Sequence, residues 1–178
     1  MSVDPTAAKY PSLVPARGVA SIEVRPAIDD DRAILMEVYR ASRDEELAIL
    51  PWSDEDKAAF LAMQFDAQDR YYADTLPTTE RSVVMLDGHP IGRLYVDIDD
   101  ERVLIVDIAL LPEHRERGIG SALLAGVLAE ADRRRLPTHL HVEPNNRAQR
   151  LYRRLGFRVV EPGAVYDLMV RPWSTSPR

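Results

Sequence analysis

Residues 102–111, RVLIVDIALL, form an almost wholly apolar run that ends at Pro112. A run of this length without alternation is typical of a central strand that is covered on both faces of a sheet. Asp107 is the only acid in the interior of the run. Because a carboxylate among apolar neighbours is costly to bury, we expect Asp107 to have either a partner or a function.

Segments on either side of this run show further strand and helix patterns. We expect strands at residues 19–27, 81–87, 91–99, 138–143, 157–161 and 165–170. We expect helices at residues 29–50, 53–74, 119–134 and 145–156, with a break near Ser42 in the first. Phe60, Met63, Ala67 and Tyr71 line one side of the second, and Leu123, Leu124, Val127, Leu128 and Ala131 share a face of the third. This order, which contains no repeat and no linker, predicts one domain at 19–171 between an N-terminal tail or arm at 1–18 and a C-terminal tail at 172–178.

The composition is ordinary for a globular protein of 178 residues, with 46% hydrophobic and 29% charged residues. No apolar run approaches the roughly 18 residues of a membrane span, and cysteine is absent, which excludes disulfides and a cysteine nucleophile. We therefore expect a cytoplasmic protein with no membrane partner. The net charge of −6 argues against a nucleic-acid partner and suits an amine-bearing one, although such a charge also simply keeps a small protein soluble.

Residues 114–120, HRERGIG, place two glycines at the start of the helix expected at 119–134. The first N–H groups of a helix have no intrahelical partner, so a glycine turn there can bind a phosphate, although an isolated Gly-x-Gly is also a common packing or turn feature. Two other phosphate motifs fail. A dinucleotide fingerprint needs Gly or Ala where Leu123 stands, and a P-loop needs a lysine, of which none lies within about fifty residues.

A second motif follows at residues 145–157, NNRAQRLYRRLGF. Together, Arg-x-x-Gly-x-Gly after a central strand and Asn-x-x-Ala-x-x-Leu-Tyr-x-x-x-Gly-Phe downstream resemble the GNAT superfamily of acyl-CoA-dependent N-acyltransferases. The matching residues are Arg115, Gly118, Gly120, Asn145, Ala148, Leu151, Tyr152, Gly156 and Phe157. The resemblance is close over residues 102–157, and over the rest of 19–171 it rests on the order of the elements.

The resemblance implies an α/β fold with a mixed, mostly antiparallel sheet that is splayed in the middle and has helices on both faces. It also implies that acetyl-CoA is the co-substrate. Backbone N–H groups of the glycine turn would bind the pyrophosphate, and these belong to Arg117, Gly118, Ile119, Gly120 and Ser121. The pantetheine arm would pair with the strand edge at Ala109, Leu110 and Leu111, where the N–H of Ala109 or Leu110 would polarise the thioester carbonyl.

Catalytic roles follow from the same resemblance. Tyr152 matches the tyrosine that protonates the leaving thiolate, although by its pattern alone it is a core aromatic of an amphipathic helix. Asp107 is our first candidate for the general base, Glu143 the second and Glu113 the third. Family members often work through a water chain, and some need no dedicated base. Asn145 would bind the cofactor or cap its helix.

A histidine-rich strand offers a further set of polar side chains. His139, His141 and Glu143 share one face at a period of two. This spacing could suggest metal ligation, but we expect hydrogen-bonded polar residues and no metal, with a histidine as a possible proton relay.

The acceptor is expected to be a primary amine of a small molecule or a protein. In the family it is selected by the early helices and the last hairpin, here near Trp52, Asp54, Glu55, Asp56, Gln64, Gln68, Tyr71 and Tyr72. The acids at 54–56 equally suit a helix start. The alternatives to an enzyme are a non-catalytic acyl-CoA-binding or sensing module and an interaction protein with this fold. A homodimer through the final strands is expected by analogy only.

Overall fold

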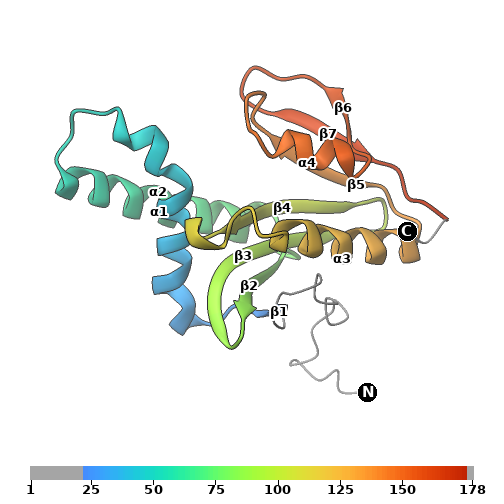
Figure 1. Ribbon diagram of the computed structural model, residues 1–178, viewed down its shortest axis with the longest axis horizontal. Coiled ribbons are helices and arrows are strands. Elements are labelled where there is room, and N and C mark those ends of the chain that lie inside the picture. Colours follow the sequence, from blue (N-terminus) through green and yellow to red (C-terminus); the bar gives the residue numbers. More distant parts are fainter. Residues whose placement is uncertain (1–21, 176–178) are drawn as a thin grey trace.

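The computed structural model describes residues 22–175, which form one seven-stranded sheet with helices on both of its faces (Figure 1). The expected tail at 1–18 lies outside the described residues. The strands are β1 (Ile22–Pro26), β2 (Glu80–Leu86), β3 (His89–Ile98), β4 (Val103–Leu110), β5 (Thr138–Val142), β6 (Arg158–Glu161) and β7 (Asp167–Arg171). The helices are α1 (Arg32–Ala48), α2 (Asp54–Thr75), α3 (Ile119–Arg134) and α4 (Gln149–Arg154), with short 3-10 turns η1 (Asp29–Asp31) and η2 (Pro112–His114).

The sheet has the order β1-β2-β3-β4-β5-β7-β6, and every neighbouring pair is antiparallel except β4 and β5. Those two parallel strands pair only from Val103–Ile105 to Thr138–Leu140. Beyond these residues they separate, so that the sheet is divided into two wings (Figure 1). The expected fold class, a mostly antiparallel mixed sheet splayed in its middle, is confirmed.

Two apolar clusters cover the sheet. The larger joins strands of both wings to α3, whose predicted stripe is entirely buried and consists of Leu123, Leu124, Val127, Leu128 and Ala131. The smaller lies between α1, α2 and β2, and includes Leu35, Tyr39 and Phe65. None of the helices in residues 22–175 is long and apolar enough to cross a membrane.

Two expectations for the early helices were wrong. Helix α1 runs through Ser42 without a break, because the Ser42 hydroxyl donates a 2.6 Å hydrogen bond to the Tyr39 carbonyl and so is satisfied inside the helix. Helix α2 buries Leu61 and Phe65, whereas Met63 and Tyr71 are more than half exposed. Apolar residues occur on both stripes of α2, and the contact of Phe65 with Tyr39 of α1, at 5.6 Å between ring centroids, selects the buried one.

Candidate active site

A bulge in β4 decides which way its polar side chain points. In the β3–β4 pairing Tyr95 lies opposite Asp107 and Val96 lies opposite Ile105, so Val106 has no partner. Before the bulge Val103 and Ile105 face the α3 core, and after it Ile108 and Leu110 do. Strict alternation would have aimed Asp107 at that core; the extra residue turns it to the α1–α2 side instead.

A cleft of about 220 Å³ opens where β4 and β5 separate, and Asp107 lies in its wall. It collects four of the predicted site residues, Asp107, Ala109, Glu143 and Tyr152. Further lining residues include Tyr39, Arg43, Glu46, Gln68, Arg93, His141, Asn146 and Tyr166. Gln68 was expected near the acceptor, whereas Arg93 was missed because it belongs to no motif and becomes part of the cleft only through strand pairing.

Asp107 has a charged partner in the cleft. Its Oδ2 accepts a 2.6 Å hydrogen bond from Nη2 of Arg93, whose side chain is only 3% exposed. The guanidinium of Arg93 also lies between the rings of Tyr39 and Tyr95, at 5.5 and 5.4 Å from their centroids. One oxygen of Asp107 is therefore engaged by a permanent positive charge.

Glu143 follows β5 and lies half-buried at the cleft. Its carboxylate forms no ion pair with the described residues, so it is less constrained than Asp107. The third base candidate, Glu113, is exposed on η2 and does not line the cleft. His141 lines the cleft but His139 does not, and no group of three potential ligands that could hold a metal ion occurs in residues 22–175.

Tyr152 is 8% exposed and packs edge-to-face on Phe157, at 5.9 Å between ring centroids. Burial, and secondly the charge of Asp107, raises the pKa of Tyr152 to about 12. The phenol is thus protonated near neutral pH and has a proton to donate. Because the raised pKa also reflects the negative charge nearby, Tyr152 and Asp107 share one electrostatic environment.

The loop before Tyr152 differs from the expectation. Helix α4 begins at Gln149, four residues later than predicted, and the side chain that supports its start is Asn146 rather than Asn145. The Asn146 Oδ1 accepts a 2.9 Å hydrogen bond from the Ala148 N–H, and Asn145 is exposed outside the cleft lining. The predicted cap at Asn145 was therefore wrong, because the intervening residues form a turn instead of helix.

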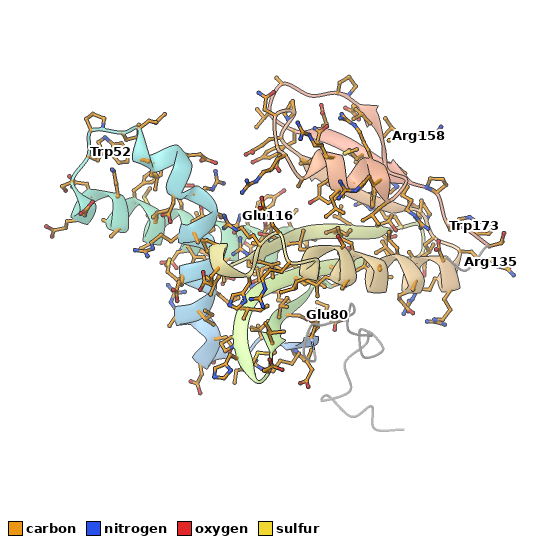
Figure 2. The ribbon with its side chains drawn as sticks, viewed as in Figure 1. Trp52, Glu80, Glu116, Arg135, Arg158 and Trp173 are labelled. Carbon is orange, nitrogen blue, oxygen red and sulfur yellow. The ribbon has the colours of Figure 1, made fainter. Side chains whose placement is uncertain are left out.

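The glycine turn lies between α1 and α2 on one side and β5 to β7 on the other, where Glu116 is labelled in Figure 2. The first helical bond of α3 runs from the Ala122 N–H to the Gly118 carbonyl, so the N–H groups of Ile119, Gly120 and Ser121 precede the helical ladder. Gly118 has φ +82°, which by itself favours glycine. Gly120 has no such φ, and a Cβ there would meet no atom within 4 Å. No described residue contacts the position of a Cβ at 120, so the glycine leaves open space beside these N–H groups.

Arg115 anchors this turn. Its Nε donates to the Leu110 carbonyl at 2.9 Å, and its Nη2 donates to the Ala41 carbonyl of α1 at 3.0 Å. The side chain therefore joins the turn to β4 and α1. Arg117 is exposed.

The N–H groups of the expected strand edge do not all point toward the cleft. Leu111 donates its N–H to the Ile91 carbonyl at 2.9 Å, which removes Leu111 from the set expected to pair with pantetheine. Successive N–H groups of a strand point to opposite edges, so the N–H of Leu110 points away from β3, toward the side where β5 has separated. Of the two expected donors, Ala109 and Leu110, this geometry favours Leu110.

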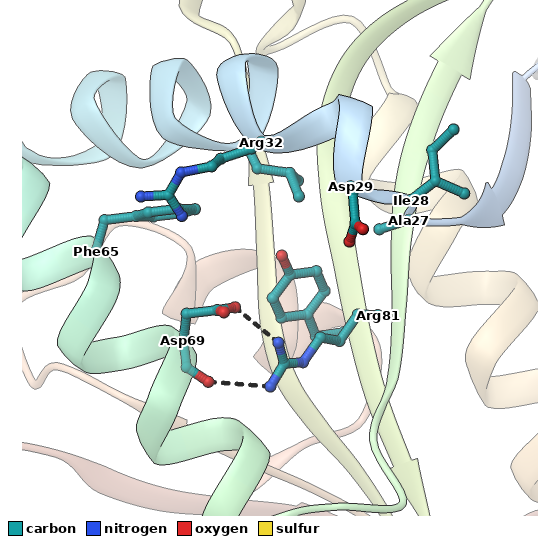
Figure 3. A pocket seen from close by; sticks show the side chains of 9 residues that line it. Ala27, Ile28, Asp29, Arg32, Phe65, Asp69 and Arg81 are labelled. Atoms are coloured by element: carbon teal, nitrogen blue, oxygen red, sulfur yellow. Dashed lines mark hydrogen bonds and ion pairs between the residues drawn. The ribbon is translucent and has the colours of Figure 1, made fainter.

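A larger hollow of about 320 Å³ lies between the start of α1, α2 and strands β2 and β3 (Figure 3). Both of its arginines are already paired: Arg81 bonds Asp69 at 2.7 Å, and Arg32 bonds Asp66 beside the Phe65 ring. It contains neither motif residue nor open strand edge. The β4–β5 cleft is therefore the candidate active site.

Part of the region expected to select the acceptor lies away from this cleft. Trp52 is 42% exposed at the outer end of the α1–α2 pair (Figure 2), where it packs on Phe60. The acids at 54–56 occupy the first turn of α2, where the Ser53 hydroxyl accepts from the Asp56 N–H. Their position matches the helix dipole.

Comparisons with known proteins agree with this geometry. Residues 35–157 match the model of the acetyltransferase (GNAT) family. Over 105 residues the chain is 31% identical to a Bacillus subtilis (strain 168) protein named "putative ribosomal protein bS18-alanine N-acetyltransferase", covering 55% of this chain and 66% of that one.

Solved structures share the fold. The PaiA N-acetyltransferase of Thermoplasma acidophilum, in complex with coenzyme A, superposes with a TM-score of 0.67 at 20% identity, over 86% of this chain and 99% of the other. An acetyltransferase of Thermus thermophilus superposes with a TM-score of 0.63 at 20% identity, over 86% and 98% of the two chains. With the family model matching more than half of its length, the chain belongs to the GNAT family of acetyltransferases.

Proposed function

We propose that this protein transfers an acetyl group directly from acetyl-CoA to a primary amine, in the cleft between β4 and β5. The observation that carries the proposal is the separation of these two strands after Ile105 and Leu140, which exposes a strand edge leading to the glycine turn. The coenzyme A complex of the Thermoplasma relative and the name of the Bacillus relative, an N-acetyltransferase, support the same chemistry.

The backbone would hold the co-substrate. The N–H groups of residues 117–121 suit its pyrophosphate, because the N-terminus of α3 favours an anion and Gly120 leaves space for one. The pantetheine arm would pair with β4 at Ala109 and Leu110. The Leu110 N–H would then stabilise the negative charge that develops on the thioester oxygen when the amine attacks.

Two side chains would move protons. As the amine nitrogen bonds to the carbonyl carbon, the carbon–sulfur bond breaks, and the buried Tyr152 hydroxyl gives its proton to the departing thiolate. The proton that the new amide nitrogen loses would restore the phenol. The ammonium form of the acceptor must first lose a proton. Glu143 now ranks before Asp107 for this step, since Asp107 is engaged by Arg93, and His141 is available as a relay in the same cleft.

The proposal is tested by measuring the release of the CoA thiol from acetyl-CoA with a panel of amines, including peptides with an N-terminal alanine. Tyr152→Phe should lower kcat by about a hundredfold, because a general acid is lost. The Kd for CoA should change by less than about twofold, since the ring keeps its contact with Phe157. Tyr71→Phe is the matched control, because Tyr71 was expected near the acceptor but lies on an exposed face of α2 outside the lining of the cleft.

Unchanged turnover in Tyr152→Phe would contradict the acid role. Binding of acetyl-CoA without thiol release for any amine would indicate an acyl-CoA-binding or sensing module. A melting temperature that does not respond to acetyl-CoA would instead favour an interaction protein with the GNAT fold.

A further inference from the structure

Arg93 is a buried arginine whose hydrogen-bonding capacity is only partly used. Both of its bonds come from Nη2, to Asp107 Oδ2 at 2.6 Å and to Gln68 Oε1 at 3.3 Å. Its Nε is buried and has no hydrogen-bond partner among residues 22–175. A guanidinium carries five N–H donors, and leaving a buried charged donor unpaired is costly. The cleft therefore contains a cation that still requires an oxygen acceptor.

The same arginine is held in place. The rings of Tyr39 and Tyr95 lie within 5.5 Å of its guanidinium carbon, and the bond to Asp107 fixes one end of the fork. A fixed fork loses little conformational entropy when it binds a second oxygen ligand. Arg43, the other arginine of the cleft, already bonds Glu46 at 2.9 Å. Its side chain is 34% exposed, so water can satisfy its remaining donors.

Arg93 lies near the position proposed for the reacting thioester carbonyl. In the register of β3 and β4, Arg93 lies directly opposite Ala109, next to Leu110, whose N–H is proposed to polarise the thioester. Asp107 lies two residues before Ala109, and the bulge turns both to the α1–α2 side. Cross-strand neighbours have Cβ atoms about 5 Å apart. A group attached to the carbon that bears the attacking amine is thus within reach of Arg93.

We propose that the acceptor is an amino carboxylic acid, whose carboxylate takes the free donors of Arg93 while its amine lies beside the second oxygen of Asp107. The pair Arg93–Asp107 would bind the two charges of a zwitterion, one on each member. A carboxylate is favoured over a neutral carbonyl as the partner of Arg93, because its two oxygens can accept two parallel N–H bonds from the guanidinium and because opposite charges attract strongly in a buried site. This inference rests on the proposed function and names the substrate class of that site.

The test compares matched trios of acceptors: an amino acid, its amide and its decarboxylated amine, with apolar, acidic and basic side chains in turn. The wild-type kcat/KM should be highest for the acid in at least one trio. Arg93→Lys keeps the charge but loses the fork, so kcat/KM for the acid should fall about tenfold or more, and that for the amine by less than about threefold. Arg81→Lys, an arginine paired with an aspartate in the other hollow, should leave both values unchanged.

Calorimetry on the CoA-bound protein separates this inference from the proposed function. Tighter binding of the acid than of the amine would support Arg93 as the carboxylate ligand even without turnover. Equal use of acid, amide and amine, with equal losses in Arg93→Lys, would overturn the inference and leave the N-acetyltransferase proposal standing. If Arg93→Lys does not fold, inhibition of the wild type by carboxylic acids that lack the amine, and not by their amides, is the expected result; no difference between them would overturn it.

Discussion

Replacing Gly120 with alanine should stabilise the free protein and at the same time weaken its binding of coenzyme A. Gly120 is the second residue of α3, has no positive φ, and a Cβ there would contact nothing within 4 Å. Alanine is better than glycine in a helix by about 0.5–1 kcal/mol. For a chain of this size that gain raises the melting temperature by about 1–4 °C.

In the complex the same methyl group would occupy the space of the pyrophosphate. If it prevents one charge-assisted hydrogen bond from the backbone, the loss is about 1.5–3 kcal/mol, or roughly a ten- to hundredfold increase in Kd. The two effects have opposite signs. A general destabilisation therefore cannot account for the loss of binding.

The assay is thermal unfolding of the free protein together with calorimetric titration of CoA. Gly118→Ala is the matched variant: its φ of +82° makes alanine strained by about 1–2 kcal/mol, so the free protein should be less stable. If Gly120→Ala raises the melting temperature but leaves Kd within about twofold, the turn does not bind the pyrophosphate. If it lowers the melting temperature, the open space beside Gly120 is not as described.

Three further predictions concern stability. Arg115→Ala should cost about 1–3 kcal/mol in urea unfolding, because two carbonyls lose their donor, whereas the exposed Arg117→Ala should cost less than about 0.5 kcal/mol. The hydrogen bond from Arg133 lowers the pKa of Glu130 from 4.5 to about 2, so the unfolded chain binds that proton first and stability falls as the pH drops from about 4.5 toward 2. Glu130→Gln should be less stable at pH 7 and lose less between pH 5 and 3, and an unchanged pH slope would contradict this. Ser53→Ala removes the cap of α2 and should cost about 1 kcal/mol, measurable as a lower urea midpoint.

Local patterns in the sequence were sufficient for most elements and for the position of the glycine turn before α3. The stripe of α3 is buried as predicted, because a period of 3.6 residues leaves one apolar face whatever the helix packs against. The order of strands and helices also follows from segments that alternate or repeat over a few residues. The buried face of helix α2 could not be predicted from its pattern, because the helix has apolar residues on two stripes. The contact between Phe65 and Tyr39 of α1 decides which stripe is buried.

Side-chain direction at the cleft depends on contacts between distant segments. The base candidates at Asp107 and Glu143 were identifiable as acids near strand ends, but which of them is free depends on Arg93, fourteen residues away on β3. Likewise, the sequence predicts that Leu111 belongs to the strand edge beside the cleft, but its N–H donates to the Ile91 carbonyl of β3. Such pairings have no signature within a single strand.

The sequence by itself determined the family, the sheet with its apolar central strand, and the glycine turn, since each depends on residues that are neighbours along the chain. Only the tertiary structure decided what that strand presents to the cleft. A single extra residue at Val106 reverses the alternation of side chains along β4, so that Asp107 faces Arg93 and not the α3 core. Leu110 then lies on a strand edge with which β5 no longer pairs. The physical reason is that a strand has a period of two, so one unpaired residue exchanges its faces, and only the pairing partner shows where that residue lies.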